Sequence, residues 1–329
     1  MTTPRFVAAE AVASPILILG APRSGTTWLA KIIDSHPDVI YRHEPDETLP
    51  APPSLEAAAL PPLLGRWIAD RGPRAVSFKP FFRKSFQPAW ASSVRLAIAT
   101  AVKAAGRLPP PVEWLARVPI PDFAAHPAPR IAIKSVRWAE GAAVLARSLP
   151  ESRTIFILRH PCGQVASLMH GARQRHFDLR TDGTDMPFDE AAAVAFAAIH
   201  GLDDPGFQAL PDAAKYAWSW RAFNEPAYAA LAALPNVHVV LYEALCARPE
   251  AESRRILAFA GLGWNMQTED FVARSTVHRG KAGYYAVYRN AAAAAEKWRK
   301  TMLPADQQAV RSVMAVSPLA RFWPDLVAD

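Results

Sequence analysis

The chain has 329 residues, is 51% hydrophobic and 20% charged, and is therefore long enough to bury a large core. Its formal charge of +7 favours an anionic ligand, but the basic residues form no continuous run, so nucleic acid is not expected as a partner. Two cysteines, Cys162 and Cys246, are too few for a disulfide framework or a cysteine-based metal cluster, and no metal site is expected. No apolar run approaches the roughly 20 residues that span a bilayer, and no secretory signal is evident, so a cytoplasmic protein is expected.

Short apolar runs alternate with helical segments along the chain. Such runs are too short for helices and fit strands that are buried on both faces, as in a parallel sheet. The expected strands are residues 16–19, 39–41, 131–133, 154–158 and 237–241. The expected helices are residues 26–35, 138–148, 162–174, 213–233 and 250–260. The sequence therefore predicts an α/β fold, with a parallel sheet flanked by helices, in a single domain over residues 1–329.

Two segments interrupt this alternation. The first, at about 45–130, holds many of the 31 prolines and is expected to be an irregular helical insertion that shapes an acceptor pocket. The second, at about 177–212, is rich in Asp, Gly and Pro. Both are expected to lie on the acceptor side of the domain.

The first expected strand leads into a near match to a phosphate-binding loop. Residues 15–33 read PILILGAPRSGTTWLAKII, with Gly20 and Gly25 at the spacing of G-x-x-x-x-G-K-[ST] and Thr27 at the final hydroxyl position. Thr26 stands where the lysine belongs. A strand, a glycine turn and a helix in this order direct backbone N–H groups and the positive end of a helix toward an anion. The segment therefore predicts a phosphate site without the usual lysine.

The strand ends argue against a magnesium-dependent nucleoside triphosphatase. Such enzymes place an Asp at the end of a neighbouring strand, where it holds Mg²⁺ through water. Here the strand at 154–158 ends in Arg159, and the strand at 237–241 ends near Glu243. A cation at a strand end repels a metal and attracts a second anion. The chain is therefore expected to bind a nucleotide with phosphates at two places, for chemistry without Mg²⁺.

These features resemble the sulfotransferases that use 3′-phosphoadenosine 5′-phosphosulfate (PAPS). The similar segments are PRSGTTWL at 22–29, LRHPCGQVASLMH at 158–170 and LYEALCARPEAESRRILAFAGL at 241–262. The last resembles the strand, Tyr-Glu pair and following helix of the family. The resemblance implies a P-loop nucleotide-binding fold of the bacterial or carbohydrate type, with PAPS as the sulfuryl donor and PAP as the product.

The resemblance assigns the first loop to the 5′-phosphosulfate. Arg23 lies three residues before the usual lysine position, and there it would neutralise charge as the S–O bond breaks. The two threonines would donate to the 5′-phosphate. The loop residues expected to bind the nucleotide are Arg23, Ser24, Gly25, Thr26 and Thr27. Trp28 resembles the aromatic residue that stacks on adenine, and a core tryptophan is the alternative.

The 3′-phosphate has two sets of candidates. Arg159 and Ser167 have the spacing of eight residues that the family uses for this phosphate. The segment HRGKAG at 278–283 resembles the family's late basic loop, with Gly and Lys in altered order. Its candidates are Arg279, Gly280 and Lys281, and solvated loop charges are the alternative.

A base must accept the acceptor's proton. In the family a Lys-Thr-His run often supplies it, but IAIKSVR at 131–137 matches only Lys134 and has Val136 in place of His. Carbohydrate-type members instead place a glutamate shortly after the first helix, where VIYRHEP at 39–45 supplies Glu44. His43 is the competing base. Adjacent strand residues point to opposite faces, so only one of the two is expected to face the sulfur, and Glu44 is preferred.

Three further possibilities remain open. Glu44 could instead be a structural carboxylate paired with Arg42 or Arg137. The chain could be a Mg²⁺-dependent P-loop kinase of a small metabolite, or a nucleotide-binding protein without turnover.

For the sulfotransferase, the expected acceptor is a small hydroxylated molecule such as a glycan, glycolipid or lipid-like natural product. A lipid-like acceptor would bring the protein to a membrane surface.

Overall fold

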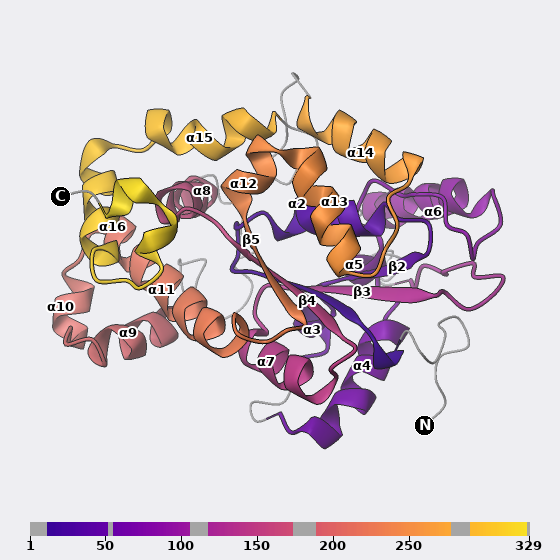
Figure 1. Ribbon diagram of the computed structural model, residues 1–329, viewed down its shortest axis with the longest axis horizontal. Coiled ribbons are helices and arrows are strands. Elements are labelled where there is room, and N and C mark those ends of the chain that lie inside the picture. The colour runs from indigo at the N-terminus through magenta and orange to yellow at the C-terminus, as the bar shows by residue number, and fades with distance from the viewer. Residues whose placement is uncertain (1–11, 52–54, 106–117, 174–188, 278–289, 328–329) are drawn as a thin grey trace.

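The computed structural model describes residues 12–51, 55–105, 118–173, 189–277 and 290–327 (Figure 1). Its strands are β1 (Ile16–Leu19), β2 (Val39–His43), β3 (Arg130–Ser135), β4 (Arg153–Leu158) and β5 (Val237–Leu241). They form one parallel sheet in the order β2-β3-β1-β4-β5. This confirms the expected parallel α/β fold. Each expected strand is present, and β2 continues two residues beyond its expected end.

Helices cover both faces of the sheet. They are α2 (Thr26–Asp34), α3 (Pro45–Thr48), α4 (Leu60–Ala69), α5 (Pro73–Val76), α6 (Ala91–Ala105), α7 (Ala139–Ser148), α8 (Pro161–Arg173), α9 (Glu190–Ala198), α10 (Asp204–Gln208), α11 (Asp212–Leu231), α12 (Tyr242–Ala247), α13 (Pro249–Phe259), α14 (Met266–Thr276), α15 (Ala291–Thr301) and α16 (Pro304–Met314). In the described part of the chain, no helix is both long enough and apolar enough to cross a membrane.

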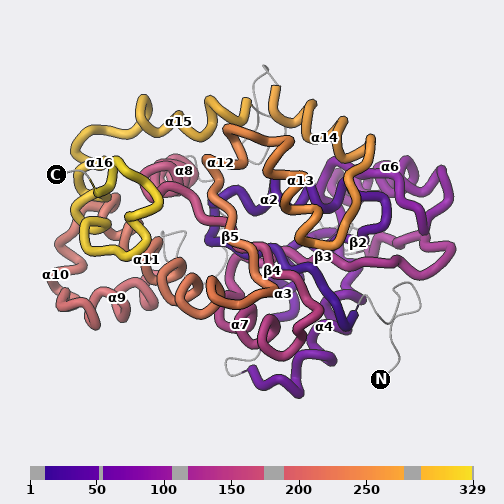
Figure 2. The backbone as a smooth tube through the Cα atoms, viewed as in Figure 1, coloured from indigo at the N-terminus to yellow at the C-terminus, as the bar shows by residue number. Residues whose placement is uncertain are grey.

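Side-chain alternation along β1 divides the core into two layers. Ile16 and Ile18 pack with α2, α13 and α14 on one face of the sheet. Leu17 and Leu19 pack with α4, α7, α8 and α11 on the other face. Successive strand residues point to opposite faces, so an uninterrupted apolar run is what a strand covered on both sides requires. Figure 2 shows the result, a central sheet with the C-terminal helices α15 and α16 at one end and α6 at the other.

The described parts of the two predicted insertions are largely helical. The first contains α3 to α6 and a 3₁₀ turn at Ala57–Ala59, and the second contains α9 and α10. Among these, α5 packs against the edge strand β2. The first insertion therefore lies beside the end of β2 that carries His43. The single-domain organisation remains a prediction.

Candidate active site

Four of the five strands deliver candidate residues to one edge of the sheet. The carboxyl ends of parallel strands meet at the same edge, so the segments that follow β1, β2, β3 and β4 converge there. These strand ends and the segments after them carry the loop at 20–27, Glu44, Lys134 and Arg159. The fold thus brings together candidates that are far apart in the sequence.

The loop after β1 has the backbone geometry of an anion site. Arg23 and Gly25 adopt positive φ angles of 70° and 102°. A Cβ on Gly25 would lie 2.5 Å from a ring carbon of Tyr242, so the close approach of this ring requires glycine. Gly25 is also the N-cap of α2 and provides no side-chain cap for the first turn. The amide groups at this helix end can therefore serve a ligand.

Ser24 adds a hydroxyl group to the loop. Its side chain is buried, and its Oγ has no hydrogen-bond partner among the described residues. A buried hydroxyl without a partner costs free energy, which a bound acceptor oxygen would recover. Thr26 is buried and Thr27 half-buried at the start of α2. The loop therefore offers both backbone and side-chain donors to an anion.

Arg23 links the loop to the candidates after β4. Its Nε donates to Ser167 Oγ at 3.1 Å, and its carbonyl oxygen accepts from Arg159 Nη1 at 2.9 Å. Ser167 is the seventh residue of α8, as its spacing from Arg159 predicts. Gln164, on the same helix, donates to the carbonyl oxygen of Pro22 at 2.9 Å. The structure therefore joins Arg23, Arg159 and Ser167 in one cluster.

Tyr242 is a further residue of this cluster. The guanidinium of Arg159 lies 4.6 Å from the centre of its ring, and the same ring packs on Gly25. Arg159 Nε is buried and has no hydrogen-bond partner in the part of the chain that the structure describes. The sequence singled out Tyr242 as part of the Tyr-Glu pair of segment 241–262. It did not indicate that the ring contacts the loop, because this contact depends on how β4 and β5 lie side by side.

Trp28 packs beneath the loop. Its side chain is buried, its Nε1 donates to Ser275 Oγ at 3.0 Å, and its ring meets Tyr242 edge-on at 6.4 Å. These contacts favour the alternative of a core tryptophan, and stacking of Trp28 on adenine stays a prediction. The candidates Arg279, Gly280 and Lys281 lie outside the described residues.

Glu44 and Lys134 form an ion pair at the ends of β2 and β3. Lys134 Nζ donates to Glu44 Oε1, and the backbone N–H of Glu44 donates to the carbonyl oxygen of Lys134 at 2.9 Å. Burial by itself would raise the pKa of Glu44, but the charge of Lys134 and its hydrogen bond outweigh burial and lower this pKa to about 2. Glu44 is therefore a carboxylate at neutral pH.

The expectation that His43 and Glu44 point to opposite faces is wrong. His43 Nε2 lies 3.8 Å from Glu44 Oε2. The strand ends at His43, and Glu44 has left-handed backbone angles (φ 47°, ψ 51°), so the two-residue alternation stops before it. Pro45, the first residue of α3, was the sequence signal for this strand end.

His43 is held in a fixed position. Its Nδ1 lies 2.7 Å from the Tyr41 hydroxyl, and its ring stacks on Phe78 at 4.4 Å. Burial, followed by repulsion from Lys134, lowers the pKa of His43 to about 3. The imidazole is therefore neutral at physiological pH. With the Tyr41 hydroxyl donating to Nδ1, the proton of this neutral ring is on Nε2, which faces Glu44.

The two arginines considered as structural partners of Glu44 bind other carboxylates. Arg42 makes a two-pronged ion pair with Asp122, at 3.1 and 2.8 Å. Arg137 lies 3.7 Å from Glu47. The ion-pair partner of Glu44 is instead Lys134, and neutral His43 lies 3.8 Å away; both are candidate catalytic residues.

Comparison with known proteins identifies the family. The sequence profile of the sulfotransferase family matches residues 15–266, which is more than half of the chain. No protein with curated annotation matches the chain. Among solved structures, the chain is similar to the sulfotransferase domain from the curacin biosynthetic pathway, with 16% identity, a TM-score of 0.42, and coverage of 92% of this chain and 97% of that one.

Two further structures are similar at the same level. Mouse sulfotransferase SULT7A1 complexed with PAP has 16% identity, a TM-score of 0.44, and coverage of 97% of this chain and 90% of that one. Sulfotransferase STF9 from Mycobacterium avium has 15% identity, a TM-score of 0.44, and coverage of 95% and 77%. The profile match confirms the resemblance carried by the three sequence segments: the chain belongs to the sulfotransferase family and is a sulfotransferase.

Proposed function

We propose that this sulfotransferase moves the sulfuryl group of PAPS to a hydroxyl group of a small acceptor, with Glu44 as the general base. The observation that supports this most is the half-buried, ionised carboxylate of Glu44 paired with Lys134. Lys134 pairs in register with Ile18 of β1 on one side and with His43 of β2 on the other. It therefore lies on the strand between the phosphate loop and the base.

The residues present fit an anionic nucleotide donor. Ser24 Oγ and Arg159 Nε are buried donors without partners among the described residues. The first turn of α2, which has no side-chain cap, adds backbone donors in the same loop. PAPS would supply the sulfuryl group, and these donors would hold its charged groups.

Arg23 is proposed to balance charge at the site of transfer. It lies in the loop, and the backbone and side-chain contacts with Arg159 and Ser167 fix its position. Arg159 and Ser167 are proposed to bind the 3′-phosphate. Arg23 contacts both Arg159 and Ser167, so changes at Arg23 and at either of these residues need not be additive.

Glu44 is ionised and can accept a proton, but its low pKa makes it a weak base while Lys134 holds it. When Lys134 Nζ turns away from Glu44 Oε1, burial becomes the dominant influence and the pKa of the carboxyl rises. We propose that this exchange makes Glu44 a stronger base when the acceptor hydroxyl is in place. His43 Nε2 lies 3.8 Å from the second carboxylate oxygen.

The acceptor is proposed to be a glycan, glycolipid or lipid-like natural product. Phe78, which stacks on His43, gives the base an apolar neighbour. Phe81 and Phe82 follow in the same segment and are half-buried. An apolar ring close to the proposed base suits an acceptor that presents a hydroxyl on a ring or on an apolar skeleton.

One assay separates this function from its alternatives. The purified protein is incubated with a panel of sugars, glycolipids and hydroxylated lipids, with either PAPS or ATP and Mg²⁺ as the donor, and the products are analysed by mass spectrometry. A sulfated product with an equal amount of PAP is expected from PAPS alone. A phosphorylated product from ATP would favour the kinase, and PAP binding without any product from the panel would favour a protein without turnover.

A further inference from the structure

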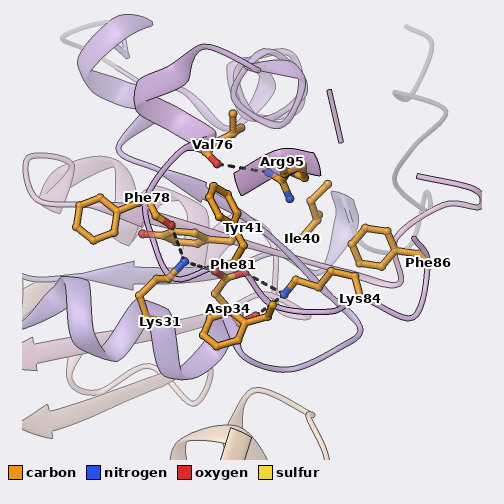
Figure 3. Close-up of a pocket in the computed structure, with 11 residues that line it drawn as sticks. Lys31, Asp34, Ile40, Tyr41, Val76, Phe78, Phe81, Lys84, Phe86 and Arg95 are labelled. Carbon is orange, nitrogen blue, oxygen red and sulfur yellow. Dashed lines mark hydrogen bonds and ion pairs between the residues drawn. The ribbon is translucent and has the colours of Figure 1, made fainter. Parts of the chain in front are cut away.

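A small cavity lies between β2, α2 and the segment that contains α5 and α6 (Figure 3). Its volume is about 20 Å³, enough for one particle of about the size of a water molecule. Aromatic side chains form much of the wall, including Tyr41, Phe78 and Phe82. Neither Glu44 nor any residue of the loop at 20–27 lines it.

The cavity has more positive than negative charge. Three cations line it, Lys31, Lys84 and Arg95, and all are at least nine-tenths buried. The only carboxylate in the lining is Asp34, which accepts from Lys31 Nζ and, at 3.0 Å, from Lys84 Nζ. Figure 3 shows both lysines directed at Asp34. Among the described residues that line the cavity, three cations thus accompany one carboxylate.

The charge of the buried carboxylate Asp122 also acts on Arg95, but it does not remove this excess. Asp122 binds the guanidinium of Arg42 at 3.1 and 2.8 Å and also lies 3.3 Å from Arg71 Nε. Its charge is therefore already matched. Burial, which is the largest influence, lowers the pKa of Lys84 to about 8, so this lysine is still mainly protonated at neutral pH. Unbalanced charge of this kind is costly in a protein interior.

Arg95 points independently to a missing ligand. Its side chain is 8% exposed, and its Nε has no hydrogen-bond partner among the residues that the structure describes. Its Nη2 makes one long contact, 3.4 Å, with the carbonyl oxygen of Val76. A buried guanidinium donor without an acceptor is rare, and an unseen water or ion commonly explains it.

We propose that this cavity binds one small monovalent anion of the size of chloride, which accepts from Arg95 Nε and is attracted by the positive charges of Lys31 and Lys84. A water molecule would accept from Arg95 but would leave the charge excess in place. The anion would link the segment around α5 and α6 to α2 and to β2. Tyr41 of β2 lines the cavity, and its hydroxyl contacts His43.

Bromide provides a direct test, because it resembles chloride and can be located by anomalous scattering. Crystals grown in sodium bromide should show an anomalous peak between Arg95 and the two lysines. The melting temperature should rise by about 2 °C for each tenfold increase in chloride or bromide above the dissociation constant, for a chain of this length. Sodium gluconate at equal ionic strength should not raise the melting temperature in this way, because the gluconate anion is too large for the cavity.

Two variants provide the matched comparison. Arg95→Met should abolish the difference between chloride and gluconate, whereas Arg83→Met, which removes an exposed cation of the same segment outside the cavity lining, should preserve it. If Arg95→Met does not fold, the proposal is still tested by the anomalous map of the bromide crystals and by the salt dependence of the melting temperature, both measured on the unmodified protein. Bromide peaks only on the surface, or equal melting temperatures in chloride and gluconate, would overturn the proposal.

Discussion

Glu44 and Lys134 are separated by 90 positions in the sequence, yet their side chains form an ion pair at the ends of two adjacent strands. A general base must be ionised and must also bind a proton well, and the ion pair affects these two requirements in opposite ways. It keeps Glu44 ionised at neutral pH, and it weakens the affinity of Glu44 for a proton. Lys134 should therefore control the pH dependence of the reaction.

Lys134→Met tests this control. The variant removes the charge and retains most of the length, so burial dominates and the pKa of Glu44 rises above its present value of about 2. A base must be deprotonated, so activity is lost as the pH falls through this pKa, and the acid limb of kcat/KM should move to higher pH. Lys134→Arg retains the charge and should leave the limb low. An unchanged acid limb in Lys134→Met would show that the limb does not report Glu44.

The 3′-phosphate assignment predicts a selective loss of nucleotide affinity. PAP and AMP differ only in the 3′-phosphate. Arg159→Ala or Ser167→Ala should weaken PAP by roughly ten- to a hundredfold, the usual scale for hydrogen bonds to charged groups, and should change AMP binding much less. Isothermal titration calorimetry measures both. Equal losses for PAP and AMP would instead place the two side chains at the 5′-phosphate, beside Arg23.

His43 should contribute to the loss of stability in acid. Its pKa is lowered from the ordinary 6.5 to about 3, first by burial and then by Lys134. The folded state favours the neutral ring, so this contribution is complete above pH 6.5 and is lost as the pH falls from 6.5 toward 3. In that window His43→Gln should reduce the slope of unfolding free energy against pH by about 1.4 kcal/mol per pH unit. Denaturant unfolding at several pH values measures the slope, and parallel slopes for both proteins would contradict the low pKa.

Transfer should not need a divalent metal. Arg159 follows β4, where a magnesium-dependent enzyme of this type would place a carboxylate, and the protein's own cations can stabilise the charge. Initial rates with PAPS should therefore be the same with and without excess EDTA. Loss of activity in EDTA and its recovery on adding Mg²⁺ would disprove this.

The sequence predicted the sheet well because its signal is local. Runs such as Ile16–Leu19 are apolar at every position, which only a strand covered on both faces requires. The end of β2 was harder to predict, because the left-handed conformation of Glu44 follows from no apolar pattern, and Pro45 was its only local signal. Because of this one backbone conformation, the side chain of His43 lies beside that of Glu44 and not on the opposite face of the strand.

Site residues were predictable where motif spacing fixes them. Arg23, Arg159 and Ser167 meet as a cluster because the ends of parallel strands converge. Tyr242 was not foreseen as their neighbour, since its contact with Gly25 depends on the order of the strands in the sheet. The cations Lys31, Lys84 and Arg95 also gave no signal, because only the tertiary structure brings these residues together.

The role of Glu44 is tested most directly by comparing Glu44→Gln with His43→Ala. Initial rates are measured at saturating PAPS with an accepted alcohol, with calorimetric PAP binding and melting temperature as checks of folding. Glu47→Gln, a nearby carboxylate paired with Arg74 and Arg137, serves as the control. Glu44→Gln should lower the rate by ~10²-fold or more with little change in PAP affinity, and His43→Ala should retain most of its activity. An active Glu44→Gln beside an inactive, folded and PAP-binding His43→Ala would make the histidine the base.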